Sequence, residues 1–169
     1  MAEFRINISN LSEGIHEYIF DAEPHKIGLD EWFCNFINVE AKLDKSLRQI
    51  FLQAKIRVEG KFICDRCLDD FLQQMNIEYS MVYIQGDRST VDVEKEEEIQ
   101  ILNADTNFID LDEDVRQYIL LTIPQKLLCR EDCQGICPIC GVNKNSASCI
   151  CSVDVVDSRW DALKKLSHN

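Results

Sequence analysis

The sequence predicts an α+β fold, built from an antiparallel β-sheet or a partly closed barrel, a few short helices, and a cysteine-rich, zinc-binding segment toward the C-terminal end. Apolar and polar residues alternate over long stretches in the first half of the chain. A helical pattern follows in the second half, and eight of the nine cysteines form four close pairs. We expect a strand-rich domain over residues 1–110, and a helix, the cysteine-rich segment and a C-terminal helix over 111–169, packed together as one unit.

Five stretches of alternating apolar and polar residues predict the strands of the sheet. Residues 4–8 and 16–20 alternate on either side of a turn, which predicts a β-hairpin. Residues 39–43, 51–62 and 71–84 continue the alternation, which predicts an antiparallel meander. The first pair of cysteines lies between the last two stretches and is therefore expected at the tip of a hairpin.

Two helices are expected in the second half of the chain. An acidic start and an apolar face predict the first helix over residues 111–122, and Pro124 ends it. Apolar residues at helical spacing predict the second helix over 157–166, with an apolar stripe that would dock on the core. The acidic run 94–98 lacks apolar periodicity, so we expect a solvated loop there.

The cysteines are spaced as ligands of two metal ions. Two thiols separated by two residues can bind one tetrahedral ion from a tight turn, and a closed structural site needs two such pairs. Gly141 follows one pair and lets the chain turn back with its amides toward the sulfurs. Four pairs therefore predict two zinc ions. The predicted ligands are Cys64, Cys67, Cys129, Cys133, Cys137, Cys140, Cys149 and Cys151.

Iron–sulfur, redox and disulfide chemistry are the alternatives to zinc. An iron–sulfur cluster would use the same thiolate ligands. A redox Cys-x-x-Cys is expected to open a helix after a buried strand, whereas Cys137 and Cys140 lie among further thiols. Disulfide frameworks belong mainly to short secreted chains, and no signal segment is recognisable here, so we expect a reduced, cytoplasmic protein. The ninth cysteine, Cys34, has no near partner and is predicted to be buried.

The sequence leaves two ways to group the eight thiols. The favoured grouping places the four thiols of residues 137–151 around one ion, because local loop closure costs little entropy. Cys64 and Cys67 would then join Cys129 and Cys133 in a long-range site. The alternative joins the first pair to the third pair and the second pair to the fourth.

The net charge of −12 and its distribution limit the possible functions. Residues 85–114 contain eleven acids and two cations, so bulk electrostatic binding of nucleic acid is excluded and any RNA contact must be local. The longest apolar runs, such as 118–123, are too short to span a bilayer, and no membrane association is expected. Three scattered histidines, no phosphate-binding Gly-rich loop and closed Cys₄ sites predict that the protein is not an enzyme.

The order of these features resembles the YceD family, the large ribosomal RNA subunit accumulation proteins. The resemblance rests on the motif Cys64-Asp65-Arg66-Cys67-Leu68, on the helix and Pro124 that follow it, and above all on residues 129–151. It continues through Asp157-Ser158-Arg159-Trp160, where the family usually has proline in place of Ser158. In the N-terminal part of the chain only the strand-rich character matches.

The resemblance implies a role in ribosome biogenesis, in the accumulation or processing of large-subunit ribosomal RNA, without enzymatic activity. The partners would be large-subunit precursor RNA or ribosomal assembly proteins. A second hypothesis is a zinc-stabilised adaptor that docks a basic ribosomal protein or nuclease through the acidic segment 87–114. Cations near the cysteine pairs are the candidate RNA contacts. They are Arg66, Lys126, Arg130, Lys144 and Arg159, with Lys164 and Lys165 further along the chain.

Overall fold

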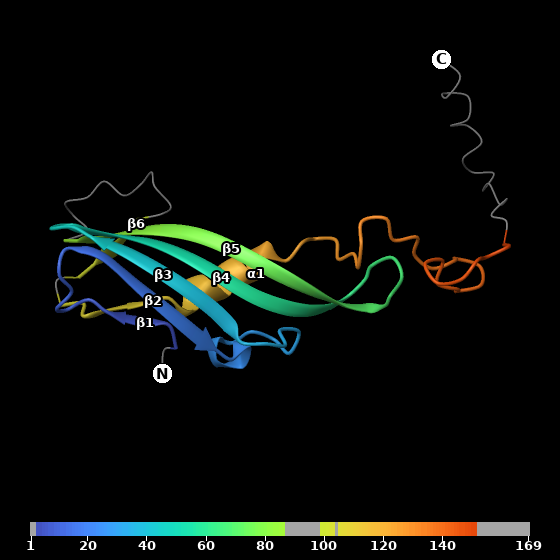
Figure 1. Cartoon of the computed structure of the whole chain (residues 1–169), viewed down its shortest axis with the longest axis horizontal. Coiled ribbons are helices and arrows are strands. Elements are labelled where there is room, and N and C mark those ends of the chain that lie inside the picture. Colours follow the sequence, from blue (N-terminus) through green and yellow to red (C-terminus); the bar gives the residue numbers. More distant parts are fainter. Residues whose placement is uncertain (1–2, 87–98, 104, 152–169) are drawn as a thin grey trace, which may run out of the picture.

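The computed structural model describes residues 3–86, 99–103 and 105–151. Strands dominate these ranges, and one α-helix accompanies them, in agreement with the predicted α+β class (Figure 1). In chain order the elements are β1 (Arg5–Asn7), β2 (Gly14–Ala22), the 3-10 helix η1 (Pro24–Ile27), β3 (Ile37–Lys45), β4 (Gln49–Ile63), β5 (Asp70–Gln85), β6 (Ile99–Leu102), β7 (Phe108–Asp110) and α1 (Asp112–Thr122). None of the described helices is long and apolar enough to cross a membrane. The predicted helix at 157–166 and the acidic run 94–98 lie outside the described residues.

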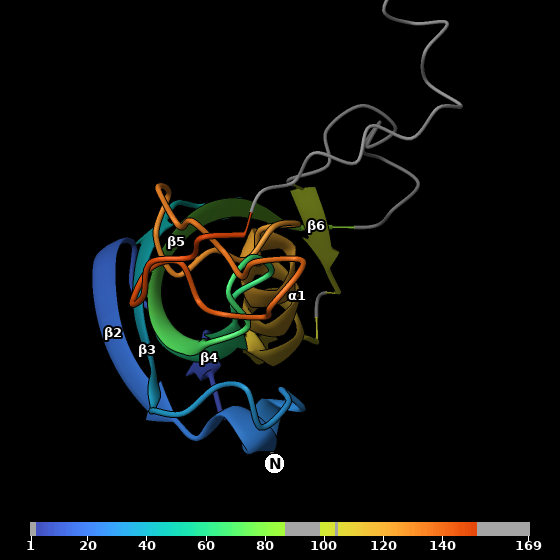
Figure 2. The ribbon, with the colours of Figure 1, turned by 90° about the vertical axis from the view of Figure 1, so that its right-hand side faces the viewer.

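The main sheet has five strands in the order β2-β3-β4-β5-β6. The strands β3 to β5 form the predicted antiparallel meander and β2 extends it, and β4 and β5 make a long hairpin with its tip at residues 64–69. In contrast, β6 pairs with β5 in parallel, which the prediction of an antiparallel sheet missed. Parallel pairing needs a connection of a dozen or more residues, and residues 86–98 supply that length. The sheet curves around α1 but remains open rather than forming a barrel, with β2 and β6 as its edges (Figure 2).

The core lies between the concave face of the sheet and α1. Alternation along β3, β4 and β5 places every second side chain on this face, where most are buried. Val115 and Ile119 of α1 are buried against it. The ring of Tyr118 stacks on that of Tyr79 of β5, with the ring centroids 4.4 Å apart. This packing fixes the position of α1, and thus the point at which the cysteine-rich segment begins.

The N-terminal strand pairs with a distant strand instead of its neighbour in sequence. β1 lies antiparallel to β7, and β2 pairs with β3. The carboxylate of Asp112, in the first turn of α1, accepts the backbone amides of Glu3 and Phe4 at 2.7–3.1 Å. The predicted hairpin between residues 4–8 and 16–20 is therefore wrong, because the start of α1 holds the first strand. The expected domain boundary at residue 110 stays a prediction.

Cys34 is exposed, which corrects the prediction that it is buried. It lies in the loop between η1 and β3, where the neighbouring Phe33 takes the core position and forms an isolated bridge with Gly60 of β4. A Cβ on Gly60 would lie 2.5 Å from the ring of Phe62, so any larger residue at that point of β4 would displace this buried ring. Aromatic packing therefore decides which residue of the loop turns inward.

Candidate metal centres

The eight paired cysteines form two separate groups of four. Within each group the sulfur atoms all lie within 4.8 Å of one another. The structure shows the grouping that loop closure favours and not the alternative one. Cluster 1 consists of Cys64, Cys67, Cys129 and Cys133, and cluster 2 consists of Cys137, Cys140, Cys149 and Cys151.

Cluster 1 joins the tip of the β4–β5 hairpin to the segment that follows α1 (Figure 1). Backbone hydrogen bonds hold these two parts together beside the thiols. The amide of Asp65 donates to the carbonyl of Leu127 at 2.8 Å, and the amide of Leu127 donates to the carboxylate of Asp65 at 2.7 Å. Three of the four cysteines are buried. Cluster 1 is thus an enclosed link between elements that are far apart in sequence.

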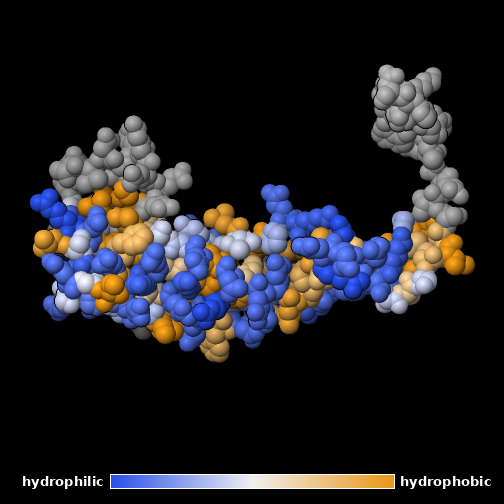
Figure 3. All heavy atoms as spheres, turned by 45° about the horizontal axis from the view of Figure 1, so that its top comes forward, coloured by the Kyte–Doolittle hydropathy of each residue, from blue (hydrophilic) through white to orange (hydrophobic). Residues whose placement is uncertain are grey.

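Cluster 2 is local, and it lies toward the end of the described chain. All of its ligands come from residues 137–151. Cys137 is buried and Cys140 is exposed, while the other two cysteines are half-buried. Ile139 and Ile150 are exposed beside them, at the end of the molecule where hydrophobic residues are visible in Figure 3. The surroundings of cluster 2 are therefore more open than those of cluster 1.

The spacing of the sulfurs suits one tetrahedral ion in each cluster. Zn–S bonds of about 2.3 Å put the corners of a tetrahedron about 3.8 Å apart. The sulfurs of Cys64 and Cys133 are 3.8 Å apart and those of Cys67 and Cys129 are 3.6 Å apart, while two pairs in cluster 2 are 3.5 and 3.3 Å apart. A disulfide needs about 2.05 Å, and all nine cysteines are free. A polynuclear iron–sulfur cluster would spread its thiolates over two or more irons, so this geometry favours a single ion.

The two Cys-x-x-Cys turns have the same local geometry. The amide of Leu68 donates to the carbonyl of Cys64, and the amide of Gly141 donates to the carbonyl of Cys137, both at 2.9 Å. Both donors adopt the left-handed backbone conformation, with φ of 63° at Leu68 and 73° at Gly141. This conformation costs a non-glycine residue about 1–2 kcal/mol. Cluster 1 therefore keeps a strained turn that cluster 2 forms without strain.

Backbone amides aimed at the first cysteine of each turn stabilise its thiolate. Burial acts to raise the pKa of Cys64, but the surrounding amides, led by that of Cys129, lower the pKa to about 6. The amide of Cys140 is the main cause that lowers the pKa of Cys137 to about 6. Each cluster thus contains a thiol that ionises readily. A metal ion would displace the protons that the other thiols hold, because zinc binds thiolates.

Asn145 links the two clusters. Its side-chain amide donates to the sulfur of Cys133 at 3.3 Å and to the side-chain oxygen of Asn143 at 2.9 Å. Its side-chain oxygen accepts the amide of Gln134 at 2.8 Å. Asn143 in turn donates to the carboxylate of Asp69 at 2.6 Å. A residue from the loop of cluster 2 thus supports a ligand of cluster 1, a role that sequence reasoning missed because asparagine is also common in turns.

Arg66 and Gly135 form the junction between the clusters. The carbonyl of Arg66 accepts the amide of Ile136 at 3.0 Å. The guanidinium of Arg66 donates to the carbonyls of Glu131 and Cys133 at 3.1 and 2.9 Å. Gly135 has φ of 70°, and a Cβ on it would lie 2.9 Å from the carbonyl oxygen of Arg66. Arg66 therefore organises cluster 1, and glycine is required where the two chain segments meet.

Both clusters, the hairpin tip and α1 lie within the part of the chain that matches a known family. Residues 52–167 match the model of the large ribosomal RNA subunit accumulation protein YceD. The chain belongs to the YceD family. Uncharacterized proteins of Mycobacterium bovis and of two strains of Mycobacterium tuberculosis are similar to it, each 29% identical over 149 residues that cover 85% of this chain and 69% of the relative. No solved structure matches the chain.

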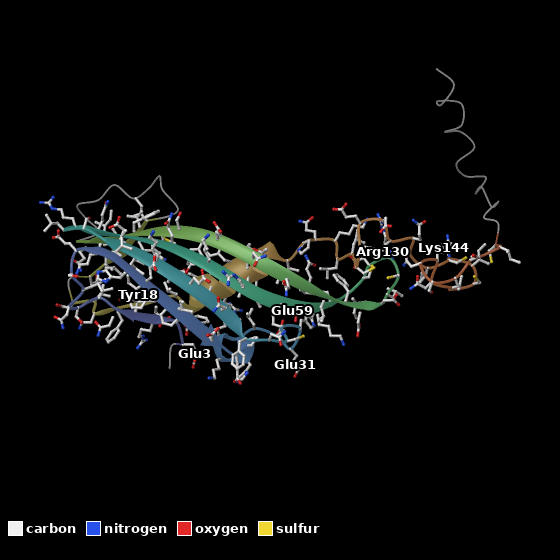
Figure 4. The ribbon with its side chains drawn as sticks, viewed as in Figure 1. Glu3, Tyr18, Glu31, Glu59, Arg130 and Lys144 are labelled. Carbon is white, nitrogen blue, oxygen red and sulfur yellow. The ribbon has the colours of Figure 1, made fainter. Side chains whose placement is uncertain are left out.

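The candidate RNA contacts of this YceD family chain differ in how available they are. Arg66 is half-buried, and its guanidinium is occupied by carbonyl groups. Arg130 is exposed, and its guanidinium donates to the side-chain oxygen of Asn145 at 2.7 Å and pairs with Asp132 at 3.3 Å. Lys126 and Lys144 are exposed, and Figure 4 shows Arg130 and Lys144 at the cysteine end. Arg159 lies outside the described residues, as do the two lysines that follow it.

Proposed function

We propose that this protein is a non-catalytic ribosome biogenesis factor that supports the accumulation or processing of large-subunit ribosomal RNA in the cytoplasm. A structural zinc ion would occupy each cysteine cluster. The observation that carries the proposal is the family match, which spans both clusters and the elements that position them. The family is described by its connection to large-subunit ribosomal RNA, and membership extends that connection to this chain.

The chemistry of the clusters supports a structural metal. Each cluster offers four thiolates at the spacing of one tetrahedral ion, which leaves no open position for water or substrate. Zinc bound there would order residues 129–151, where few large apolar side chains are available to do so. Elemental analysis of the purified protein should find two zinc atoms per chain. A metal-free, fully folded protein would contradict this part of the proposal.

Lys126 and Lys144 are the side chains best placed for local contact with RNA. Both are exposed at the cysteine end, whereas Arg66 and Arg130 are occupied by protein groups. The net charge of −12, with about −2 more from each zinc–thiolate site, opposes attraction of RNA at long range. Contact with RNA would therefore be short-ranged and weakened by salt.

Binding of large-subunit precursor RNA at low salt tests this role. Lys126→Glu combined with Lys144→Glu should make the negative slope of log affinity against log salt shallower by about two, one for each lost phosphate contact. Lys42→Glu combined with Arg48→Glu is the control, because it changes the net charge equally at exposed positions of β3 and of the turn that follows it. The control should leave the slope unchanged. Equal effects of the two double variants would exclude a local RNA contact at the cysteine end.

A protein-interaction adaptor is the second candidate, favoured by the acidity of the chain. The segment 87–114 would dock a basic ribosomal protein or a nuclease. In its described part, Asp110 pairs with Arg5 at 3.1 Å and Asp112 accepts backbone amides, so these two acids serve the fold. A pull-down from lysate with and without ribonuclease separates the candidates. Capture of partners that survives ribonuclease favours the adaptor, and capture that is lost favours the RNA-associated factor.

A further inference from the structure

β2 is an edge strand that lacks two common forms of protection against pairing. It spans nine residues, and its register with β3 is unbroken from Gly14 opposite Lys45 to Ala22 opposite Ile37. Proline and bulges often protect such edges, and β2 contains neither. Among the described residues, β3 is the only strand paired with it. Backbone donors and acceptors of β2 therefore point outward along its other side.

Both faces of the sheet are incompletely covered beside this edge. On the outer face, Ile15 and Ile19 of β2 are 59% and 72% exposed. On the inner face, Tyr18 and Phe20 are only half-buried, although the corresponding row of β3 is buried. Figure 4 marks Tyr18 on β2. A further strand at this edge would bury apolar surface on both faces, which favours binding.

The side chains along the edge are acidic. Residues 13–23 contain Glu13, Glu17, Asp21 and Glu23, and no lysine or arginine. Glu17 and Asp21 are exposed on the outer face and alternate there with the two isoleucines. Like charges placed opposite each other across a strand pair are destabilising, and opposite charges are favourable. The edge therefore disfavours a second copy of β2 and favours a basic strand.

We propose that the free edge of β2 binds a basic, extended segment of a protein partner as an added β-strand. Main-chain hydrogen bonds to β2 provide affinity. Lysine or arginine at every fourth position of the partner lies beside Glu17 and Asp21. Apolar side chains on the opposite face of the partner strand cover Tyr18 and Phe20. This site goes beyond the role in ribosomal RNA accumulation and is independent of the metal, because β2 supplies no ligand to either cluster.

A synthetic peptide tests the proposal on the purified full chain. The probe is fluorescent Lys-Val-Thr-Val-Lys-Val-Thr-Val-Lys with blocked ends, whose lysines and threonines share one face of a strand. Anisotropy measures its affinity, and backbone amide NMR shifts of the protein locate it. We expect saturable binding, with the shifts concentrated in β2 and β3.

Backbone methylation of the probe distinguishes strand pairing from charge attraction. A second peptide carries N-methyl groups on all nine residues, with the lysine charges unchanged. An added strand needs its own amides to pair with β2 whichever way it runs, so the methylated peptide should lose binding. Equal binding by the methylated and unmethylated peptides would overturn the proposal.

Two double variants with the same change in net charge locate the site. Glu17→Lys with Asp21→Lys should weaken binding about tenfold, because cross-strand attractions become repulsions. Glu31→Lys with Glu131→Lys makes the same change at exposed positions outside the sheet, and should weaken binding less than about twofold at physiological salt. Equal losses in the two variants, or amide shifts outside β2 and β3, would overturn the proposal. A homodimer formed through the β2 edges, detected by sedimentation, would overturn it too.

Discussion

Cluster 1 and cluster 2 offer the same four thiolates but depend on the fold in different ways. Cluster 1 joins cysteines that are 62 and 69 positions apart, and three of its four thiols are buried. Cluster 2 gathers its ligands within residues 137–151 and leaves Cys140 exposed. The first cluster can form only when the hairpin and α1 are in place, whereas the second can form within its own loop. Metal binding is therefore linked to global folding in cluster 1 and to local order in cluster 2.

The largest effect is expected from the loss of a buried ligand of cluster 1. Cys133→Ser should remove one of two zinc equivalents and lower the free energy of unfolding by about 4 kcal/mol. A ligand gives this stabilisation when its free concentration is about a thousandfold above its Kd and it binds only the folded state. Elemental analysis and urea unfolding, followed by far-UV circular dichroism, measure the two quantities.

A strong chelator provides the matched experiment on the unaltered chain. Removal of zinc should lower the free energy of unfolding by a similar amount, because the same metal bridge is lost. If Cys133→Ser and chelation each change that free energy by less than about 1 kcal/mol, cluster 1 is not linked to global folding.

A smaller effect is expected where the two clusters touch. Asn145→Ala should weaken zinc binding at cluster 1 about 10- to 100-fold, the usual result of removing a group that hydrogen-bonds a metal ligand. The amide of Asn145 donates to the sulfur of Cys133, so the loss should fall on cluster 1 although the residue belongs to the loop of cluster 2. Competition with a chromogenic chelator measures both affinities. Ser146→Ala, at the next and exposed position, is the control. A loss confined to cluster 2 would contradict this link.

Much of the fold could be predicted from local patterns, but the strand partners could not. Alternation located β2 to β5, because each of these strands has one buried and one exposed face. The same pattern carries no information on which strands pair. β1 pairs with β7 because the Asp112 carboxylate accepts the amide of Phe4, the residue just before β1. β6 pairs with β5 in parallel after a long connection. Cys34 turned outward because Phe33 filled the available core position.

The candidate site shows the same division between local and long-range information. Cysteine spacing identified the eight thiols, and the low cost of local closure indicated their grouping. The support from Asn145 was missed, because turn propensity explained that residue without reference to a sulfur. Arg66 and Arg130 stay predictions as RNA contacts, but the guanidinium of Arg66 donates to carbonyls of the cluster 1 segment, and that of Arg130 donates to Asn145 in the loop of cluster 2. The sequence alone does not show whether a charged side chain is already hydrogen-bonded within the protein.

The two Cys-x-x-Cys turns offer a comparison at the scale of one residue. Gly141→Ala adds a Cβ at a left-handed position with open space around it, so only the backbone penalty acts. It should weaken zinc binding at cluster 2 by about 1 kcal/mol, or about fivefold. Leu68→Gly removes the same penalty at cluster 1, but glycine is also freer in the unfolded chain, so the gain should be between zero and about 1 kcal/mol. Competition with a chelator measures the zinc affinity of both variants. Weaker zinc binding in Leu68→Gly than in the unaltered protein would contradict backbone strain at Leu68.

The smallest effect on the sheet, and the sharpest separation of the clusters, is expected from Cys149→Ser with Cys151→Ser. Both ligands are half-buried in the loop of cluster 2. The metal site that they help to form contains no residue of the sheet. The protein should lose one zinc equivalent, yet the free energy of unfolding of the sheet should change by less than about 0.5 kcal/mol, as for substitutions away from the core. Zinc analysis and urea unfolding provide the readouts. If both ions are lost, the contact through Asn145 makes the clusters one cooperative unit, and their independence is disproved.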